Sequence, residues 1–264
     1  MGDEYPEAEV QGIDLSPIQP GWIPPNVRFL VDDAEAAWTY PANSLDYVHI
    51  RHMTSSIRDW PKLISQAYEY VVLSFVLLSL FPSTFALPIL PALPLWGEEL
   101  ANQDSHTDNY RALKPGGWIE LQELRFVASC DDGTLPPQSY VVKFLQGVKD
   151  GLAAFGVDLL GMQKNQENVK AAGFVSVDEQ AFKVPIGSWP RNQKMKTIGT
   201  YNRSMIYDGL QGISMGPFTR GLKWSPQEVE VFLVDVRKAL LDRSQHSYLP
   251  FHVVIGQKPH STSS

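Results

Sequence analysis

The chain has 264 residues, of which 44% are hydrophobic and 19% are charged, and its net charge is −7. This length suffices for one large α/β domain over residues 1–264, and the acidic balance argues against direct nucleic-acid binding through phosphate neutralisation. The single cysteine, Cys130, excludes an intramolecular disulfide framework and predicts a cytoplasmic or nuclear location, while the histidines lack neighbours with metal-ligand spacing, so no metal site is expected.

Three short strands are predicted near the start of the chain, because apolar, β-branched and aromatic residues gather there between turn-forming residues. They cover residues 8–14, 27–31 and 44–50. The Pro-rich stretch 17–25 cannot form a long regular helix and is expected to be a loop. A helix is predicted over 59–68, because Leu63, Ile64 and Ala67 share one helical face.

The segment from Leu113 to Leu121 predicts a sharp change of structure. Pro115 presets φ for a turn, and Gly116 and Gly117 tolerate positive φ. We therefore expect a helix to end here, a tight turn to follow, and a strand to run over 118–122.

The remaining part of the chain continues the alternation of helices and strands. A short helix is expected over 165–172 and is followed by a strand at about 174–184. Ser225 predicts a helix start, because Pro and Glu follow it at the spacing of a capping box. A final strand is expected over 251–256. Strands separated by helices indicate a mostly parallel sheet, and ligands bind such a sheet beyond the carboxyl ends of its strands.

Several short segments occur in an order that is more specific than any one of them. They are Asp3–Pro6, Val10–Pro20, Pro25–Phe29, Asp32–Glu35, Leu45–Arg51, Asp59–Leu63, Leu113–Glu123, Ala172–Phe174 and Val253–Gly256. In this order they resemble the class I S-adenosylmethionine (SAM)-dependent methyltransferases, and most closely the fungal LaeA-like subgroup associated with regulation of secondary metabolism. The resemblance implies a Rossmann-like α/β sheet with helices on both faces, SAM as cofactor, and a small-molecule or protein methyl acceptor.

The same resemblance implies cofactor-binding residues at the first two strand ends. Asp14 should accept the ribose hydroxyls of SAM, with Leu15 beside it, because a carboxylate offers two acceptor oxygens. Asp33 and Ala34 follow the next strand, where a carboxylate can accept from the adenine amino group. The alternatives are that Asp14 only forms a strand-end turn and that Asp33 is only a solvated loop residue.

Arg51 and His52 follow the third predicted strand, and the resemblance places them near the methyl-donating sulfonium. We expect Arg51 to contribute to cofactor binding, and His52 is the candidate general base. A purely structural histidine is the alternative for His52. Residues 131–225 are expected to form a helical cover on the substrate side, and 259–264 a polar tail.

One departure from the family pattern precedes Asp14. The family opens with a strand and a Gly-rich loop, and no Gly-x-Gly-type loop precedes Asp14 here. We therefore interpret the chain as N-terminally truncated and expect impaired cofactor binding. Two alternative functions follow: a catalytically inactive methyltransferase-like interaction module, and a NAD(P)-dependent oxidoreductase, since an acidic residue after the second strand serves a ribose there too.

A second departure is the apolar, Pro-rich segment 70–111. Residues 71–97 carry no charge for 27 residues, which is long enough to cross a membrane if the segment is a genuine insertion. Prolines interrupt this run, and the codons of Glu69–Val71 can contain the fungal splice-donor sequence GTATGT. We favour a retained intron over a membrane segment. Sequencing the mature transcript tests this, because a message that keeps the 42 codons would contradict it.

Overall fold

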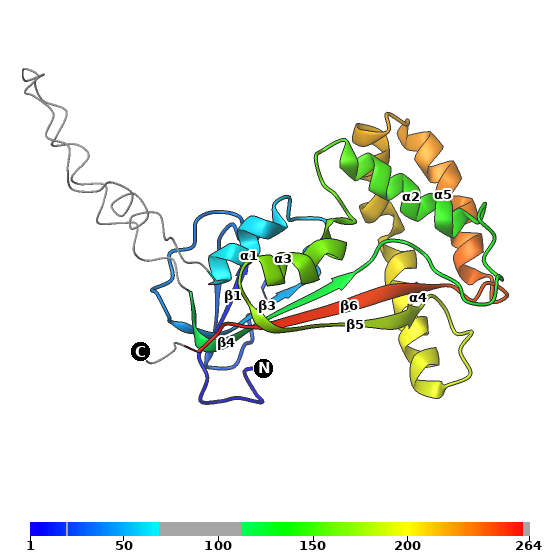
Figure 1. The fold of residues 1–264 in the computed structure, drawn as a ribbon. Coiled ribbons are helices and arrows are strands. Elements are labelled where there is room, and N and C mark those ends of the chain that lie inside the picture. The colour runs from blue at the N-terminus through cyan, green and yellow to red at the C-terminus, as the bar shows by residue number, and fades with distance from the viewer. Residues whose placement is uncertain (20, 69–111, 261–264) are drawn as a thin grey trace, which may run out of the picture. The chain divides into compact units, whose positions relative to one another are not determined.

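The computed structural model describes residues 1–19, 21–68 and 112–260. The chain divides into two compact units, one made of Met1–Leu45 and Lys62–Lys114 and the other of Asp46–Pro61 and Pro115–Ser264 (Figure 1). The predicted insertion 70–111 and most of the polar tail lie outside the described residues. Within the described ranges, no helix is both long enough and apolar enough to span a bilayer.

The first unit contains a two-stranded parallel sheet. Strand β1 (Val10–Asp14) pairs with β2 (Val27–Val31), and the register joins Asp14 to Val31. Both strands therefore end at the same edge of this sheet. The Asn26 side chain anchors the preceding segment, because its Nδ2 donates to the carbonyls of Gly2, Tyr5 and Ala8 at 3.1, 2.9 and 2.8 Å.

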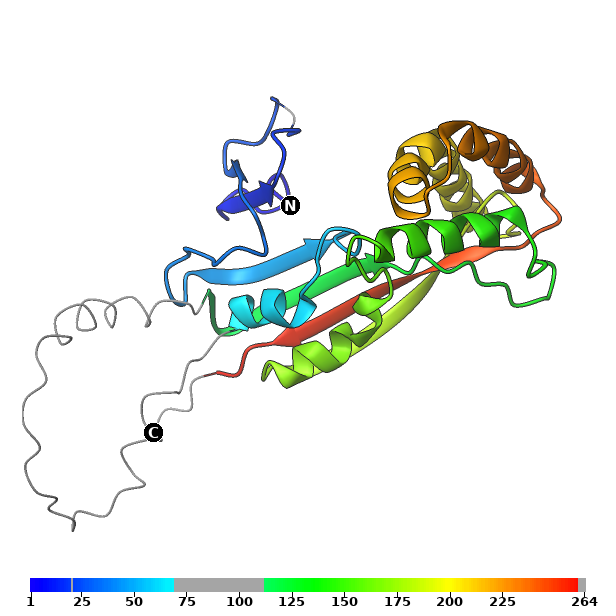
Figure 2. The same ribbon diagram turned by 90° about the horizontal axis from the view of Figure 1, so that it is seen from above.

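The second sheet has four strands in the order β3 (Leu45–Arg51), β4 (Leu113–Leu124), β6 (Tyr248–Gln257) and β5 (Val175–Pro185), as Figure 2 shows. Strands β3 and β4 are parallel, since Leu45 N donates to Ala112 O near their starts and His52 N donates to Gln122 O near their ends. Strand β6 is antiparallel to both of its neighbours. The prediction of a mostly parallel sheet is therefore wrong for the four-stranded sheet. Long helical segments connect its strands, and such connections allow the next strand to run in either direction.

The prediction of a helix end and a tight turn at 113–117 is also wrong. These residues form the beginning of β4, and Gly117 O accepts from Lys258 N at 2.8 Å. Gly116 does adopt a positive φ of 82°, and its N donates to Lys258 O at 2.9 Å. Gly116 thus adopts a left-handed conformation near the start of β4 while its backbone stays hydrogen-bonded to the chain after β6.

The predicted helices are confirmed where the sequence pattern was strong. The structure contains α1 (Trp60–Tyr68), α3 (Asn165–Ala171) and α5 (Pro226–Leu241), and Ser225 forms the predicted capping box with Glu228. Gly173 ends α3 with a φ of 102°. The other helical segments are α2 (Tyr140–Ala153), the 3-10 helix η1 (Gly161–Lys164), α4 (Gln193–Met215) and the π-helix η2 (Gly216–Gly221).

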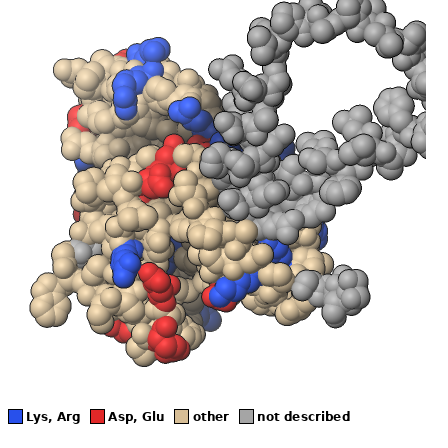
Figure 3. Space-filling view, turned by 90° about the vertical axis from the view of Figure 1, so that its left-hand side faces the viewer, with Lys and Arg blue, Asp and Glu red and all other residues tan. Residues whose placement is uncertain are grey.

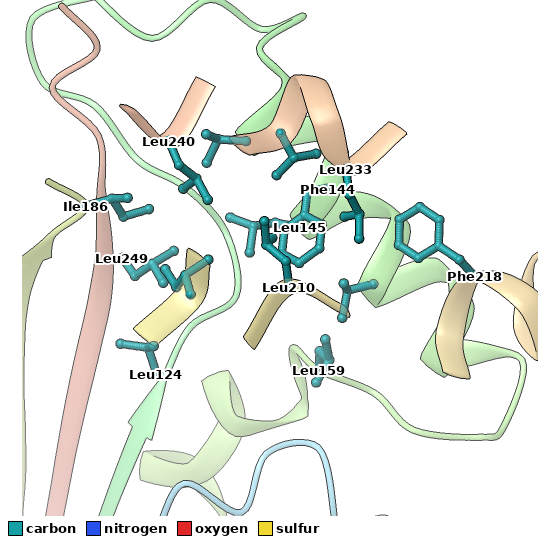
Figure 4. Packing of buried hydrophobic residues seen from close by; sticks show 14 of the residues in the cluster. Leu124, Phe144, Leu145, Leu159, Ile186, Leu210, Phe218, Leu233, Leu240 and Leu249 are labelled. Atoms are coloured by element: carbon teal, nitrogen blue, oxygen red, sulfur yellow. The ribbon is translucent and has the colours of Figure 1, made fainter. Parts of the chain in front are cut away.

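The largest described core joins the helices α2, α4 and α5 to the ends of β5 and β6 (Figure 4). Phe144 and Phe218 stack with ring centroids 6.5 Å apart, and Leu210 and Leu233 are fully buried between the helices. Helix α3 packs on β5 and β6 closer to the other end of the sheet (Figure 1). The described residues thus form sheets covered by helices, which confirms the predicted α/β class.

A loop held by Asp132 gives a pH-dependent contribution to stability. Asp132 accepts from Thr134 Oγ1 at 2.7 Å and from Cys130 Sγ at 3.1 Å, and its Oδ2 lies 2.6 Å from His246 Nδ1. The interaction with His246, followed by that with Thr134, holds the pKa of Asp132 well below its usual value. The ionised carboxylate therefore stabilises the fold above the unfolded-state pKa, and this contribution is lost as the pH falls through the folded-state value.

We expect the free energy of unfolding of the wild type to fall more steeply than that of Asp132→Asn when the pH is lowered from 7 to about 3, a range that crosses the unfolded-state pKa of about 3.9. Urea unfolding at several pH values measures this. Asp3→Asn, at an exposed position, serves as the control and should follow the wild type. Parallel curves for wild type and Asp132→Asn would contradict the assignment.

Candidate functional site

Asp14 lies at the carboxyl end of β1 and is half-buried. Its Oδ1 accepts from Ser16 N at 2.8 Å, and its main-chain O accepts from Asp32 N at 3.0 Å. Within the described residues, Oδ2 has no hydrogen-bond partner and can accept from a ligand. Leu15 follows with 67% of its surface exposed. The structure therefore places an available carboxylate oxygen and an apolar side chain at the rim of the parallel pair.

Asp33 and Ala34 follow β2 at the same edge of this sheet, because β1 and β2 are parallel. Asp33 is exposed, and its Oδ1 accepts from Glu35 N at 2.9 Å. The Ala34 carbonyl already accepts from Trp38 Nε1 at 3.0 Å. Two neighbouring strand ends thus each carry a carboxylate, as the sequence predicts.

Arg51 and His52 lie in the second unit, at the end of β3. His52 adopts a φ of 55°, a left-handed conformation that is uncommon for residues other than glycine. Partial burial and then the charge of Arg51 lower the pKa of His52, which favours the neutral imidazole. The structure thus forms two groups of predicted residues, Asp14 with Asp33 in one unit and Arg51 with His52 in the other.

Glu123 is a buried residue that the sequence analysis did not single out. It lies on β4 with 1% of its surface exposed, on the face that also buries Ile119 and Leu121. Its carboxylate accepts from Met53 N at 2.8 Å and from Thr54 N at 3.1 Å. The period-two pattern of β4 could have revealed it, since an acid on the apolar face must find partners.

The opposite face of β3 and β4 carries a separate polar group. Tyr47 Oη donates to Glu120 Oε2, and its ring stacks on that of His49 with centroids 6.0 Å apart. Burial and the hydrogen bond to Glu120 raise the pKa of Tyr47, and burial lowers that of His49. These side chains are paired with one another, and the charge of Arg51, two residues after His49 on the same strand, also lowers the pKa of His49.

Charged side chains of both signs are interspersed on the face drawn in Figure 3. Among the described residues, no group of three or more His, Cys, Asp or Glu has the geometry to hold a metal ion. The candidate residues are therefore the carboxylates at the strand ends of the first unit and the Arg51–His52 pair of the second unit.

Carboxylates at the carboxyl ends of adjacent parallel strands are typical of α/β proteins that bind a nucleotide-type cofactor. A family profile described as a methyltransferase domain matches residues 1–96. The chain is 33% identical over 261 residues to methyltransferase pytC of Aspergillus terreus, a match that covers 98% of the chain and 67% of pytC.

Two further comparisons agree. The chain is 30% identical to the secondary metabolism regulator LAE1 of Cochliobolus heterostrophus, over 98% of the chain and 72% of LAE1. It is 22% identical to the protein-methionine methyltransferase laeA of Emericella nidulans, over 98% of the chain and 58% of laeA. The chain belongs to the fungal methyltransferase family that contains pytC and LAE1, which confirms the assignment to SAM-dependent methyltransferases and not to oxidoreductases.

Proposed function

We propose that this chain transfers a methyl group from SAM to a nucleophilic atom of a small-molecule or protein acceptor. The observation that carries the proposal is Asp14, half-buried at the end of β1 with Oδ2 available to accept. Ribose hydroxyls are donors of the kind that such an oxygen binds, so the residue fits the cofactor.

The roles of the neighbouring residues follow from their chemistry. Asp33 Oδ2 would accept from the adenine amino group, while Leu15 would offer apolar surface to the adenosyl group. Ala34 would contribute main-chain contacts other than its carbonyl, because that oxygen already accepts from Trp38 Nε1. Arg51 would bind the carboxylate in the methionine portion of SAM through a charge-assisted hydrogen bond.

SAM, when bound, supplies a methyl group on a sulfonium that is open to nucleophilic attack. The protein's contribution to such a displacement is to orient the two reactants and to exclude water. A neutral imidazole of His52 would accept the proton that the acceptor atom loses. Residues 131–225 would cover the acceptor, and we propose a cytoplasmic or nuclear location for the reaction.

Two classes of acceptor remain in this proposal, a small metabolite and a protein side chain. The name of laeA, a protein-methionine methyltransferase, supports a protein acceptor, whereas the name of pytC, a methyltransferase, specifies no acceptor. Incubating the protein with methyl-labelled SAM and a fungal extract separates them by whether the label enters the protein or the small-molecule fraction. SAM binding without label transfer would instead favour the inactive interaction module.

Replacing His52 by asparagine tests its role as a base. We expect kcat to fall by about 100-fold or more, with unchanged affinity for SAM, because general-base catalysis contributes about 10²–10⁴-fold. In the wild type, kcat should decline only below about pH 6.5, since the pKa of His52 is lowered and the neutral form is the active one. His260→Asn, at an exposed position, is the control. An unchanged kcat in His52→Asn would make this histidine structural.

A further inference from the structure

We infer that Glu123 is a positioning residue for methyl transfer, which it serves by holding the segment Arg51–Thr54 in place. This inference rests on the proposed function of Arg51 and His52. Glu123 is 1% exposed and Thr54 is 2% exposed, so the two side chains meet in the interior of the second unit. Glu123 itself touches neither reactant in this proposal.

The contacts between Glu123 and the segment after β3 form a continuous series. Its Oε1 accepts from Met53 N at 2.8 Å, and its Oε2 accepts from Thr54 N at 3.1 Å and from Thr54 Oγ1 at 2.5 Å. The preceding residue of β4, Gln122, accepts from His52 N at 3.0 Å through its carbonyl. Residues 52, 53 and 54 are therefore each attached to β4, two of them through one carboxylate.

The backbone of His52 explains why such attachment matters. A φ of 55° is a sparsely populated conformation for a residue with a side chain, and it persists only where the surroundings determine it. The hydrogen bonds to Glu123 begin at the residue directly after His52. They consequently determine the direction in which the chain leaves β3 and, with it, the placement of the imidazole.

A buried carboxylate is a costly way to fill this position. Ile119 and Leu121 precede it on the same buried face of β4, where apolar side chains are the default. Burial raises the pKa of Glu123, while the three hydrogen bonds from Met53 and Thr54 act in the opposite direction. Among the described residues, the hydrogen-bond partners of this carboxylate all lie in the segment after β3, so the carboxylate fixes this segment to β4. On β6, the strand that pairs with β4 on the side away from β3, His252 is the cross-strand neighbour of Glu123. The His252 side chain is hydrogen-bonded to Glu179.

The test compares Glu123→Gln and Thr54→Val with the wild type. Glu123→Gln turns one acceptor oxygen into a donor, and Thr54→Val removes the hydroxyl with little change in shape. We expect amide hydrogen exchange of Met53 and Thr54 to accelerate at least tenfold and kcat to fall by about 10- to 100-fold, as small misplacements near the chemistry do. The variants should remain folded at the assay temperature, as circular dichroism would show. Thr54→Ser, which keeps the hydroxyl, should restore near wild-type kcat.

Glu120→Gln is the matched control, because it lies on the same strand with its side chain on the opposite face. It should leave kcat and the exchange of Met53 and Thr54 unchanged. An active wild type together with unchanged kcat in both variants would overturn the positioning role, even if exchange accelerated. Unchanged exchange in Glu123→Gln would overturn it as well. A wild type that neither binds SAM nor transfers methyl groups would instead refute the proposed function, and this role with it.

Discussion

Replacing Asp14 by asparagine is expected to weaken SAM binding by about 10- to 100-fold, because hydrogen bonds to a charged group contribute about 1.5–3 kcal/mol. Asparagine keeps one acceptor oxygen, which can still receive Ser16 N as Oδ1 of Asp14 does at 2.8 Å. The available Oδ2, however, becomes an amide that donates. Loss of affinity without loss of fold is therefore the expected outcome.

Isothermal titration of the whole chain with SAM and with S-adenosylhomocysteine measures this effect. Glu9→Gln is a suitable control, because Glu9 lies in the same unit and pairs with Arg28 at 3.5 Å on an exposed surface. Surface pairs of this kind contribute little, so binding should not change. Equal affinities of wild type and Asp14→Asn would remove Asp14 from the site and leave the proposed cofactor geometry without its main support.

Gly199→Ala is expected to destabilise the protein by about 1–3 kcal/mol, although alanine is the better helix former. Gly199 lies in the second turn of α4, and a Cβ there would lie 2.1 Å from the carbonyl oxygen of Gly187. That backbone cannot move freely, because Gly187 N donates to Gly199 O at 2.9 Å. The clash therefore outweighs the gain in helix propensity.

Gly212→Ala in the same helix is expected to change the free energy of unfolding in the opposite direction. A Cβ at Gly212 meets no atom within 4 Å, so the substitution should stabilise the protein by about 0.5–1 kcal/mol. Urea unfolding of both variants measures the pair. If both substitutions stabilised the protein, the close approach of α4 to Gly187 would be wrong.

The sequence predicted individual elements well wherever a local pattern sufficed. The strands β1, β2 and β3 and the helices α1 and α3 fall within a few residues of their predicted bounds, and α5 begins directly after Ser225, as predicted. The Ser225 capping box forms as expected, because its hydrogen bonds join residues three positions apart. Segment 113–117 was mispredicted, because Pro and Gly signal a turn locally while hydrogen bonds to Lys258 draw these residues into β4.

The strand-end residues of the candidate site could be predicted from the sequence, whereas the strand direction and the backbone conformation around them could not. Asp14 and Asp33 could be placed at one edge from strand order alone, since parallel strands share their carboxyl ends. The direction of β6 could not be predicted, because alternation of apolar residues is the same in either direction. The left-handed φ of His52 could not be predicted either, since that conformation is rare for histidine.

The sequence by itself determined that this chain is an α/β protein of the methyltransferase family with acidic residues after its first two strands. The α/β class follows from periodicity and turn chemistry, whereas the family follows from the resemblance that the order of short motifs carries. Only the tertiary structure decided which groups the Glu123 carboxylate accepts from, the main-chain N–H groups of Met53 and Thr54. The partners lie 69 and 70 positions apart in sequence, so pairing within the sheet, and no local pattern, brings them into hydrogen-bonding distance.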